Sequence, residues 1–315
     1  MNIQQLEYVI AVDNYRHFAK AADACFVTQP TLSMMIRKLE EELEVRLFDR
    51  SIQPLQPTVI GLQIIEQIRL SLKHVKQIKE IAENERNIVK GTFRLGIIPT
   101  IAPYLVPELI KKQNEKHGEI ELELYENTTD FLIKSLLNGT LDGGLMAGPL
   151  NHEALNEHPI YYEKFYAYVS PCDELYQEHK INLEEIDIRN IWLLKNIHCL
   201  RGQIELMCRK RKEIEKDFSS VTYEAGSIET LIHIVDHNTG ITIVPEMMAM
   251  GLNEERQENL RNLNVDTYRE ISLAVNKEYV RNAMLRAISD IIKSSVPVSM
   301  QDVNLKKFSV GLKHK

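Results

Sequence analysis

Apolar residues in the first fifty positions recur at spacings of three and four, the period of amphipathic helices. In the first helix these positions are Ile3, Leu6, Val9, Ile10 and Val12. Residues 18–24 contain four alanines and predict a second, short helix. The pattern then breaks at 27–30, where Thr28 suits an N-cap and Pro30 is tolerated in a first helical turn. A third helix of about four turns is predicted from the stripe Leu32, Ile36, Leu39 and Leu43.

A short helix followed by a turn and a capped, amphipathic helix is typical of a helix-turn-helix. Pro54 and Pro57 exclude a helix interior at 51–57, which suits the turn of a small β-wing. Thr58 then caps a long helix that we expect to reach roughly to Val89. Its apolar stripe consists of Ile64, Ile68, Leu72, Val75, Ile78 and Ala82. We interpret this stripe as a dimerisation surface that pairs with a second copy as a coiled coil; the alternative is packing inside one domain.

Beyond Lys90 and Gly91 the pattern changes to short strands that alternate with helices. The predicted strands are 92–98, 120–125, 141–147, 162–170, 240–244 and 269–275, and the predicted helices are 101–116, 131–137, 200–216, 227–238 and 283–292. Such alternation indicates a parallel α/β sheet. The fold class is therefore α+β multidomain, with a two-lobed, periplasmic-binding-protein-like α/β effector domain. The expected boundaries are 1–58 for the winged helix-turn-helix, 59–90 for the linker helix and 91–315 for the effector domain, with lobe I at about 91–162 and 267–295 and lobe II at about 163–266.

The composition narrows the class of protein. Of 315 residues, 44% are hydrophobic and 26% charged, which is ordinary for a globular chain and argues against disorder. No apolar run reaches the ~20 residues that span a bilayer, and no signal peptide is evident, so we expect a cytoplasmic protein without a membrane partner. Four cysteines are too few for a disulfide scaffold. The net charge is −7, and residues 1–60 carry six basic and eight acidic residues, so DNA binding there must use placed side chains.

Four segments of the N-terminal region, 18–22, 27–33, 36–43 and 47–50, resemble the LysR-type transcriptional regulators. The resemblance extends over the chain, because that family also has a linker helix and a two-lobed effector domain. It implies a homodimer or homotetramer that binds double-stranded promoter DNA. The expected DNA-contacting residues lie at the start of the third helix and before the wing: Gln29, Pro30, Thr31, Ser33, Arg37 and Arg50. The alternative for Arg37 and Lys38 is a solvated face paired with Glu40–Glu42.

A narrower resemblance lies at His198–Arg201, which Cys208 follows. This segment is similar to the hydrogen-peroxide-sensing branch of the family. The resemblance implies that Cys199 is the peroxidatic cysteine and Cys208 the resolving cysteine of an intramolecular disulfide. It also implies a peroxide pocket around Cys199 that consists of Thr100, Thr129, His198 and Arg269. The implied partners are hydrogen peroxide, a thiol–disulfide reductant and RNA polymerase, with no cofactor and no metal.

The residues themselves are consistent with a thiol switch. Cys199 falls at the start of the predicted helix 200–216, where the helix dipole and a nearby cation stabilise a thiolate. Nine helical residues span about 13.5 Å and turn about 900°, so Cys199 and Cys208 lie on opposite faces of an intact helix. A disulfide needs Cα atoms about 4.4–6.8 Å apart, so oxidation must rebuild the segment, and Gly202 eases its melting. The alternative is that both cysteines are buried small hydrophobic residues.

Three functional hypotheses follow from these patterns. We favour a non-enzymatic regulator whose DNA binding depends on the redox state of the cysteine pair. The alternative is a LysR-type regulator that senses a small metabolite in the interlobe cleft through the two threonines. A thiol peroxidase ranks last, because it leaves the helix-turn-helix without a role. The weaker candidates are Cys25 as a core residue, Cys172 as an exposed loop thiol, and His198 with His233 and His237, whose spacing is a poor pattern for zinc.

Overall fold

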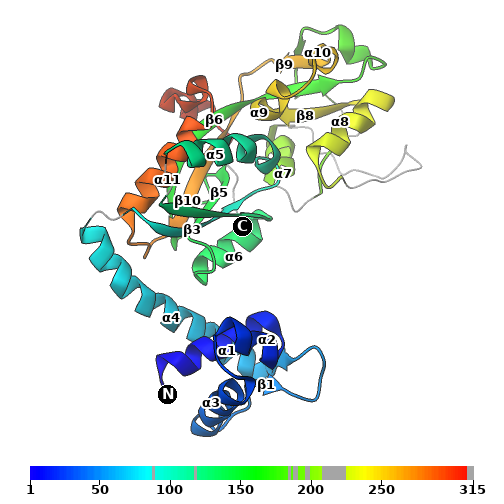
Figure 1. The fold of residues 1–315 in the computed structure, drawn as a ribbon. Helices are drawn as coiled ribbons and strands as arrows, with labels where there is room; N and C mark the ends of the chain where they lie inside the picture. The colour runs from blue at the N-terminus through cyan, green and yellow to red at the C-terminus, as the bar shows by residue number, and fades with distance from the viewer. Residues whose placement is uncertain are drawn as a thin grey trace. The chain divides into compact units, whose positions relative to one another are not determined.

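The computed structural model describes residues 1–86, 89–116, 119–183, 186, 191–195, 199–207 and 225–310. The chain divides into two compact units, Met1–Asn87 and Ile88–Lys315, each considered by itself (Figure 1). In the described part of the chain, no helix is long and apolar enough to cross a membrane.

The first unit is a three-helix domain with a two-stranded wing and a long following helix. Its elements are α1 (Ile3–Tyr15), α2 (Phe18–Ala24), α3 (Gln29–Glu42), β1 (Phe48–Asp49), β2 (Gln56–Pro57) and α4 (Val59–Glu85). Thr28 caps α3 as predicted, because its side chain accepts a hydrogen bond from the backbone N–H of Thr31. In the predicted stripe of α3 only the C-cap residue Leu43 is exposed, and the fully buried members are Leu32, Ile36 and Leu39. The predicted winged helix-turn-helix is confirmed.

The wing is anchored where the chain turns into α4. The strands β1 and β2 pair antiparallel. The Thr58 hydroxyl donates to the Arg46 carbonyl (2.6 Å) and accepts from the Gly61 N–H (2.9 Å), so it caps α4 as predicted. A Cβ at Gly61 would lie 2.0 Å from the Leu47 carbonyl oxygen. Only glycine therefore allows α4 to approach the segment before β1 this closely.

The apolar stripe of α4 packs partly on its own domain, so the alternative of packing inside one domain holds for the first half of the stripe. Ile68 is buried in the core of the first unit, and Ile64 and Leu72 pack against that core. By contrast, Val75 is 40% exposed and Ile78 is 71% exposed. Dimerisation through α4 stays a prediction, and Val75, Ile78 and Ala82 are the members of the stripe that are open to a second copy.

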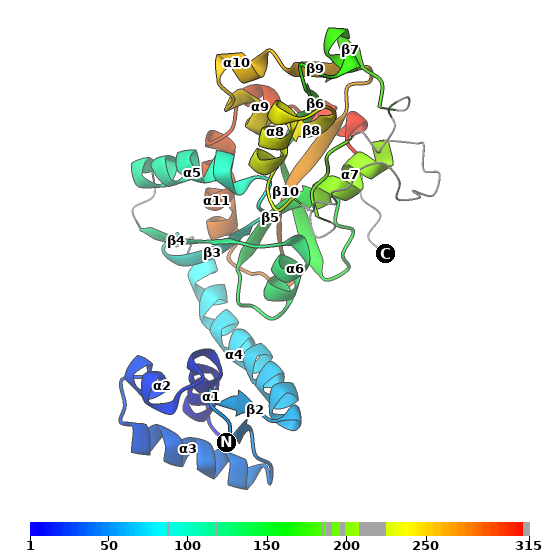
Figure 2. The same ribbon diagram turned by 90° about the vertical axis from the view of Figure 1, so that its right-hand side faces the viewer.

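The second unit is a sheet flanked by helices (Figures 1 and 2). Its strands are β3 (Gly91–Ile97), β4 (Ile120–Glu126), β5 (Gly143–Gly148), β6 (Leu155–Val169), β7 (Lys180–Ile181), β8 (Ile241–Pro245), β9 (Leu260–Leu263) and β10 (Tyr268–Asn276). Its α-helices are α5 (Ala102–Lys116), α6 (Thr129–Leu137), α7 (Cys199–Met207), α8 (Ile228–His237), α9 (Glu246–Met250), α10 (Glu254–Gln257) and α11 (Asn282–Ser294). Its described residues also include the short 3₁₀ helices η1 (Glu174–Gln177), η3 (Val298–Gln301) and η4 (Val303–Phe308).

The sheet is mixed, with strand order β4-β3-β5-β10-β6-β9-β7 and with β8 paired to β6. The strand β3 runs parallel to β4 and β5, as the helix–strand alternation predicts. The late strand β10 is antiparallel to both β5 and β6, so the parallel prediction is wrong for the sheet as a whole. The physical reason is that β10 enters the sheet after the second half of the unit and runs back beside β6.

The second unit has two hydrophobic cores that share the strand β6. The first half of β6 contributes Tyr161 to the core around β3, β5 and α11, which we call the first core. Its second half contributes Phe165 to the core around β8 and α8, which we call the second core. The start of α7 touches both, because Cys199 packs against the first core whereas Leu200 and Ile204 belong to the second. The predicted sensor cysteine therefore lies where the two cores meet.

Candidate functional site

Cys199 is the first residue of α7, and its side chain meets the start of α6. The Cys199 Sγ lies 3.0 Å from Oγ1 of Thr129, which is the first residue of α6. Thr129 is buried and Cys199 partly buried. The contact joins the first residues of the two helices. The sulfur is thus placed at two helix N-termini, whose unpaired N–H groups favour negative charge.

Burial governs the protonation of Cys199. Desolvation raises the pKa of its thiol, and the hydrogen bond from Thr129, the charge of Arg269 and the N–H groups of Cys199 and Leu200 act in the opposite direction. The predicted sources of thiolate stabilisation are present among the described residues, but desolvation outweighs them. Stabilisation of a thiolate stays a prediction, because His198, one of its expected neighbours, lies outside the described residues.

Arg269 is fully buried and held by three hydrogen bonds. Its Nε donates to Oε1 of Glu163 at 2.7 Å. Its Nη1 donates to Oγ1 of Thr100 at 3.0 Å, and its Nη2 donates to the Thr100 carbonyl at 3.1 Å. Glu163 uses its second oxygen to accept the N–H of Met247 at the start of α9. This chain of contacts fixes the position of the guanidinium relative to both cores.

The structure brings together four of the six residues predicted for the redox site: Cys199, Thr129, Arg269 and Thr100. Arg269 acts on Cys199 through its charge and binds Thr100 directly. His198 and Cys208 lie outside the described residues. The sequence interpretation missed Glu163, which stands opposite Arg269 in the register of β6 and β10. The available signal was a glutamate within an aromatic strand, a position where a buried charge requires a partner.

Two tyrosines surround this arginine–glutamate pair. The Tyr161 hydroxyl is buried and has no hydrogen-bond partner among the described residues, and its pKa lies well above the ordinary value because of burial and the Glu163 carboxylate. Tyr104 of α5 donates a hydrogen bond to Glu229 in the first turn of α8. Tyr104 packs against the second core although α5 otherwise belongs to the first. The contact therefore joins the two halves of the unit beside the redox site.

The predicted DNA-contacting residues lie on one end of α3 and beside the wing. Gln29, Pro30 and Thr31 are exposed in the first turn of α3, and Ser33 is half-buried. Arg37 is exposed and pairs with Glu41 at 3.0 Å, so the alternative of a paired, solvated face describes its state in the free protein. A surface pair of this kind is weak and can exchange for a phosphate.

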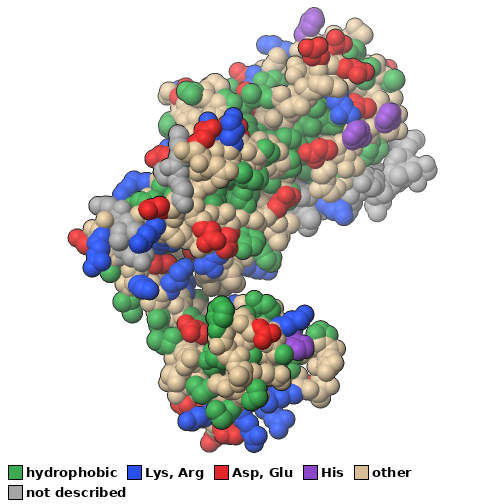
Figure 3. All heavy atoms as spheres, in the orientation of Figure 1, with side chains coloured by type: hydrophobic (Ala, Val, Ile, Leu, Met, Phe, Trp, Pro, Cys, Tyr) green, Lys and Arg blue, Asp and Glu red, His purple; other side chains and the backbone are tan. Residues whose placement is uncertain are grey.

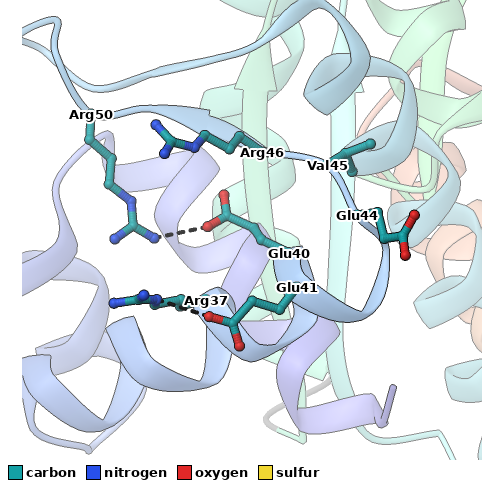
Figure 4. A pocket seen from close by; sticks show the side chains of 7 residues that line it. All are labelled: Arg37, Glu40, Glu41, Glu44, Val45, Arg46 and Arg50. Carbon is teal, nitrogen blue, oxygen red and sulfur yellow. Dashed lines mark hydrogen bonds and ion pairs between the residues drawn. The ribbon is translucent and has the colours of Figure 1, made fainter.

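Arg50 is positioned by Glu40, which the sequence interpretation considered only as a partner of Arg37 and Lys38. Its Nη2 donates to Oε2 of Glu40 at 3.0 Å, and its guanidinium lies 5.1 Å from the centre of the Phe18 ring. The other carboxylate oxygen of Glu40 accepts the N–H of Leu47 at 2.8 Å. Figure 4 shows both ion pairs in a hollow lined by Arg37, Glu40, Glu41, Glu44, Val45, Arg46 and Arg50. Basic and acidic side chains lie close together on the visible face of this unit (Figure 3).

The remaining candidates carry no comparable arrangement. Cys25 packs against the core of the first unit, as predicted, and Cys172 is exposed. The His233 ring is hydrogen bonded to Arg256 at 3.0 Å. Over the residues that the structure describes, no group of three or more His, Cys, Asp or Glu side chains is arranged to hold a metal ion.

Comparisons with known proteins agree with this architecture. Residues 3–62 match the family of bacterial regulatory helix-turn-helix proteins of the lysR type, and residues 86–297 match the LysR substrate binding domain. The chain is 35% identical over 303 residues to a hydrogen peroxide-inducible genes activator of Haemophilus influenzae, covering 93% of this chain and 98% of the relative.

Two solved structures are also similar. A full-length OxyR variant from Pseudomonas aeruginosa has a TM-score of 0.76 and 27% identity, covering 93% of this chain and 98% of the other. A hydrogen-peroxide-bound OxyR mutant from Corynebacterium glutamicum has a TM-score of 0.60 and 25% identity, covering 93% and 92%. Together with the winged helix-turn-helix and the effector domain, these matches establish that the chain belongs to the LysR family of bacterial transcriptional regulators.

Proposed function

We propose that this regulator senses hydrogen peroxide through Cys199 and reports it by a disulfide with Cys208. The observation that carries the proposal is the position of Cys199: its sulfur lies 3.0 Å from the Thr129 hydroxyl, at a helix start, within the field of the buried Arg269. These are the group types that bind a peroxide oxygen and favour a thiolate. The similarity to a peroxide-inducible activator and to a peroxide-bound OxyR points to the same signal.

The chemistry takes two steps. The Cys199 thiolate attacks one peroxide oxygen, the S–O bond forms, the O–O bond breaks, and the leaving hydroxide takes a proton to become water. The sulfur loses two electrons and becomes a sulfenic acid. The Cys208 thiol then attacks this sulfur, the S–S bond forms, and the hydroxyl leaves as water with the thiol proton. Thr129 and Thr100 hydrogen bond the peroxide, and Arg269 stabilises the developing negative charge on the oxygen that leaves.

Disulfide formation drives the response at the DNA. α7 is intact from Cys199 to Met207, so the bond to the next residue, Cys208, requires this helix to unwind. The rebuilt segment repacks a contact between subunits and changes how the paired helix-turn-helix units are presented to the promoter. The subunits pair through the exposed half of α4, at Val75 and Ile78. The protein acts in the cytoplasm, where a thiol–disulfide reductant reduces the disulfide again. RNA polymerase responds to the changed binding of the regulator at the promoter.

The DNA contact uses α3 in the major groove and the wing beside it. Gln29, Thr31 and Ser33 face base edges or phosphates from the start of α3. Arg37 and Arg50 exchange their carboxylate partners for phosphates. Because basic and acidic residues are mixed on this unit, affinity comes from these few placed side chains.

Mass spectrometry of the oxidised protein tests the proposal. Trypsin cuts after Lys195, Arg201 and Arg209, so Cys199 and Cys208 fall into separate peptides, 196–201 and 202–209. Stoichiometric peroxide should join these two peptides within one chain. Cys199→Ser should abolish the link, and Cys208→Ser should leave a sulfenic acid at Cys199 without a bridge. Oxidation at Cys172 or Cys25 with no 199–208 link would contradict the proposal and favour a metabolite sensor.

A further inference from the structure

We infer that Glu163 is a positioning residue that restrains the reactivity of Cys199 by neutralising Arg269. The inference rests on the proposed function and adds a residue to its site. It begins from the geometry of the pair: Nε of Arg269 lies 2.7 Å from Oε1 of Glu163, and both side chains are only 1% exposed. Charges this deeply buried are screened little by bulk solvent, so the field that reaches the sulfur depends on both.

Glu163 has the hydrogen bonding of a carboxylate. Oε1 accepts from Arg269, and Oε2 accepts the backbone N–H of Met247 at 3.2 Å. Both partners are donors, so neither oxygen needs a proton of its own. Burial raises the pKa of Glu163, whereas Arg269 and the Met247 N–H lower it. The negative charge of Glu163 is therefore in direct contact with the guanidinium of Arg269, whose charge acts on the Cys199 thiol.

The remaining charged and titratable groups leave Glu163 as the principal counter-charge of Arg269. Across the strand, Tyr161 presents a neutral, unpaired hydroxyl. From α5, Tyr104 is engaged with Glu229. From α9, Glu246 accepts the N–H of Lys164 at 3.0 Å instead of binding the arginine. Arg269 has its direct ion pair with Glu163 alone among the described residues.

The same contact fixes where the guanidinium can go. Thr100 accepts hydrogen bonds from Nη1 and Nη2 of Arg269, and Glu163 accepts one from Nε, so the arginine is held from two sides. A held and neutralised arginine lowers the pKa of Cys199 less than a free charge would. The Cys199 thiol therefore reacts slowly until peroxide binds, and the Glu163 carboxylate determines how slowly.

Glu163→Gln separates this role from a purely structural one. Glutamine keeps an acceptor for Arg269 but removes the negative charge, so the thiolate of Cys199 becomes the nearest compensation for the arginine. A fall of one pKa unit gives about tenfold more thiolate, and the lower nucleophilicity offsets this about threefold. We expect alkylation of Cys199 by iodoacetamide to become about threefold faster below its plateau pH, with the pH profile displaced to lower pH.

The measurement uses reduced, full-length protein, with pulses of iodoacetamide and mass spectrometry of peptide 196–201 across the pH range. Glu163→Asp keeps the charge and should restore the wild-type profile. Glu270→Gln is the matched control, because Glu270 is also buried and lies beside Arg269 on β10, but is hydrogen bonded by Tyr162 and Ser272. That control should leave the profile in place. An unchanged or slower reaction in Glu163→Gln would overturn the inference.

A double variant covers the case in which Glu163→Gln does not fold. Arg269→Gln with Glu163→Gln removes both charges of this pair, and its alkylation should be faster than that of Arg269→Gln alone. Equal rates would overturn the inference. Alkylation is independent of peroxide, so these results stand even where wild-type Cys199 proves unreactive toward peroxide. Such unreactivity would instead contradict the proposed function.

Discussion

Each of the two units of this regulator contains an arginine–glutamate pair, and the two pairs differ in their exposure to solvent. Arg50 pairs with Glu40 at 3.0 Å beside the wing, with the arginine side chain 43% exposed. Arg269 pairs with Glu163 at 2.7 Å beside the sensor cysteine, with both side chains 1% exposed. The first pair is accessible to solvent and to a phosphate, whereas the second is accessible to neither.

This difference assigns the pairs to different tasks. Water screens the exposed pair, so its net contribution to stability is small and a DNA phosphate can replace the carboxylate. The buried pair cannot exchange partners, and removal of one member leaves an uncompensated charge. The first unit therefore holds an exposed arginine that can exchange partners, and the second unit holds a buried arginine that cannot.

The largest expected effect follows from breaking the buried pair. Arg269→Ala leaves Glu163 buried without its cation and should destabilise the second unit by about 3–5 kcal/mol. The same change removes a cation from Cys199 and should raise the pKa of its thiol and slow its oxidation. Urea unfolding followed by the fluorescence of Trp192, the one tryptophan of the chain, measures the first effect. A stability loss below about 1 kcal/mol would mean that the pair is not the constraint described here.

Breaking the exposed pair should change DNA binding more than stability. Arg50→Ala should cost about 1 kcal/mol or less in stability, because Glu40 keeps its hydrogen bond from the Leu47 N–H. It should weaken binding to specific and random DNA alike and reduce the salt slope by about one. Titrations at several salt concentrations measure both, and Lys38→Ala serves as a control on the same unit. Unchanged affinity and salt slope would remove Arg50 from the DNA contact.

The sequence predicted the positions of backbone elements better than the partners of charged groups. The stripe of α3, its Thr28 cap and the start of α7 at Cys199 follow from local spacing and were found where predicted. The pairing of Glu40 with Arg50 and of Glu163 with Arg269 was not predicted, because the fold brings each arginine to its glutamate from 10 residues away in one case and 106 in the other. The burial of Cys199 where two cores meet, which raises the pKa of its thiol, has no local signature in the sequence either.

The buried environment gives a pH dependence of defined sign. Because burial raises the pKa of the Cys199 thiol, the folded state holds this proton more tightly than the unfolded chain does. Its contribution to stability is therefore complete below the ordinary thiol pKa and is lost as pH rises through the raised pKa. Alkylation of Cys199 in the folded protein should keep increasing at pH values where the urea-unfolded protein has levelled off. Coinciding pH profiles for peptide 196–201 would contradict the effect of burial.

The smallest expected effect concerns α7, the helix that must unwind on oxidation while the Arg269–Glu163 pair stays fixed. Gly202 lies inside α7, where alanine favours the helix by about 0.5–1 kcal/mol over glycine. Oxidation must unwind this helix, so Gly202→Ala stabilises the reduced form alone and should raise the reduction potential of the disulfide by about 10–20 mV. Redox titration in glutathione buffers, read from the linked and free tryptic peptides, measures the shift. Gly226→Ala is the matched control, because Gly226 lies outside the helices and a Cβ there meets no atom within 4 Å. A reduction potential that stays constant or falls in Gly202→Ala would mean that α7 remains wound when the disulfide forms. The fixed Arg269 would then lie beside a helix that does not move on oxidation.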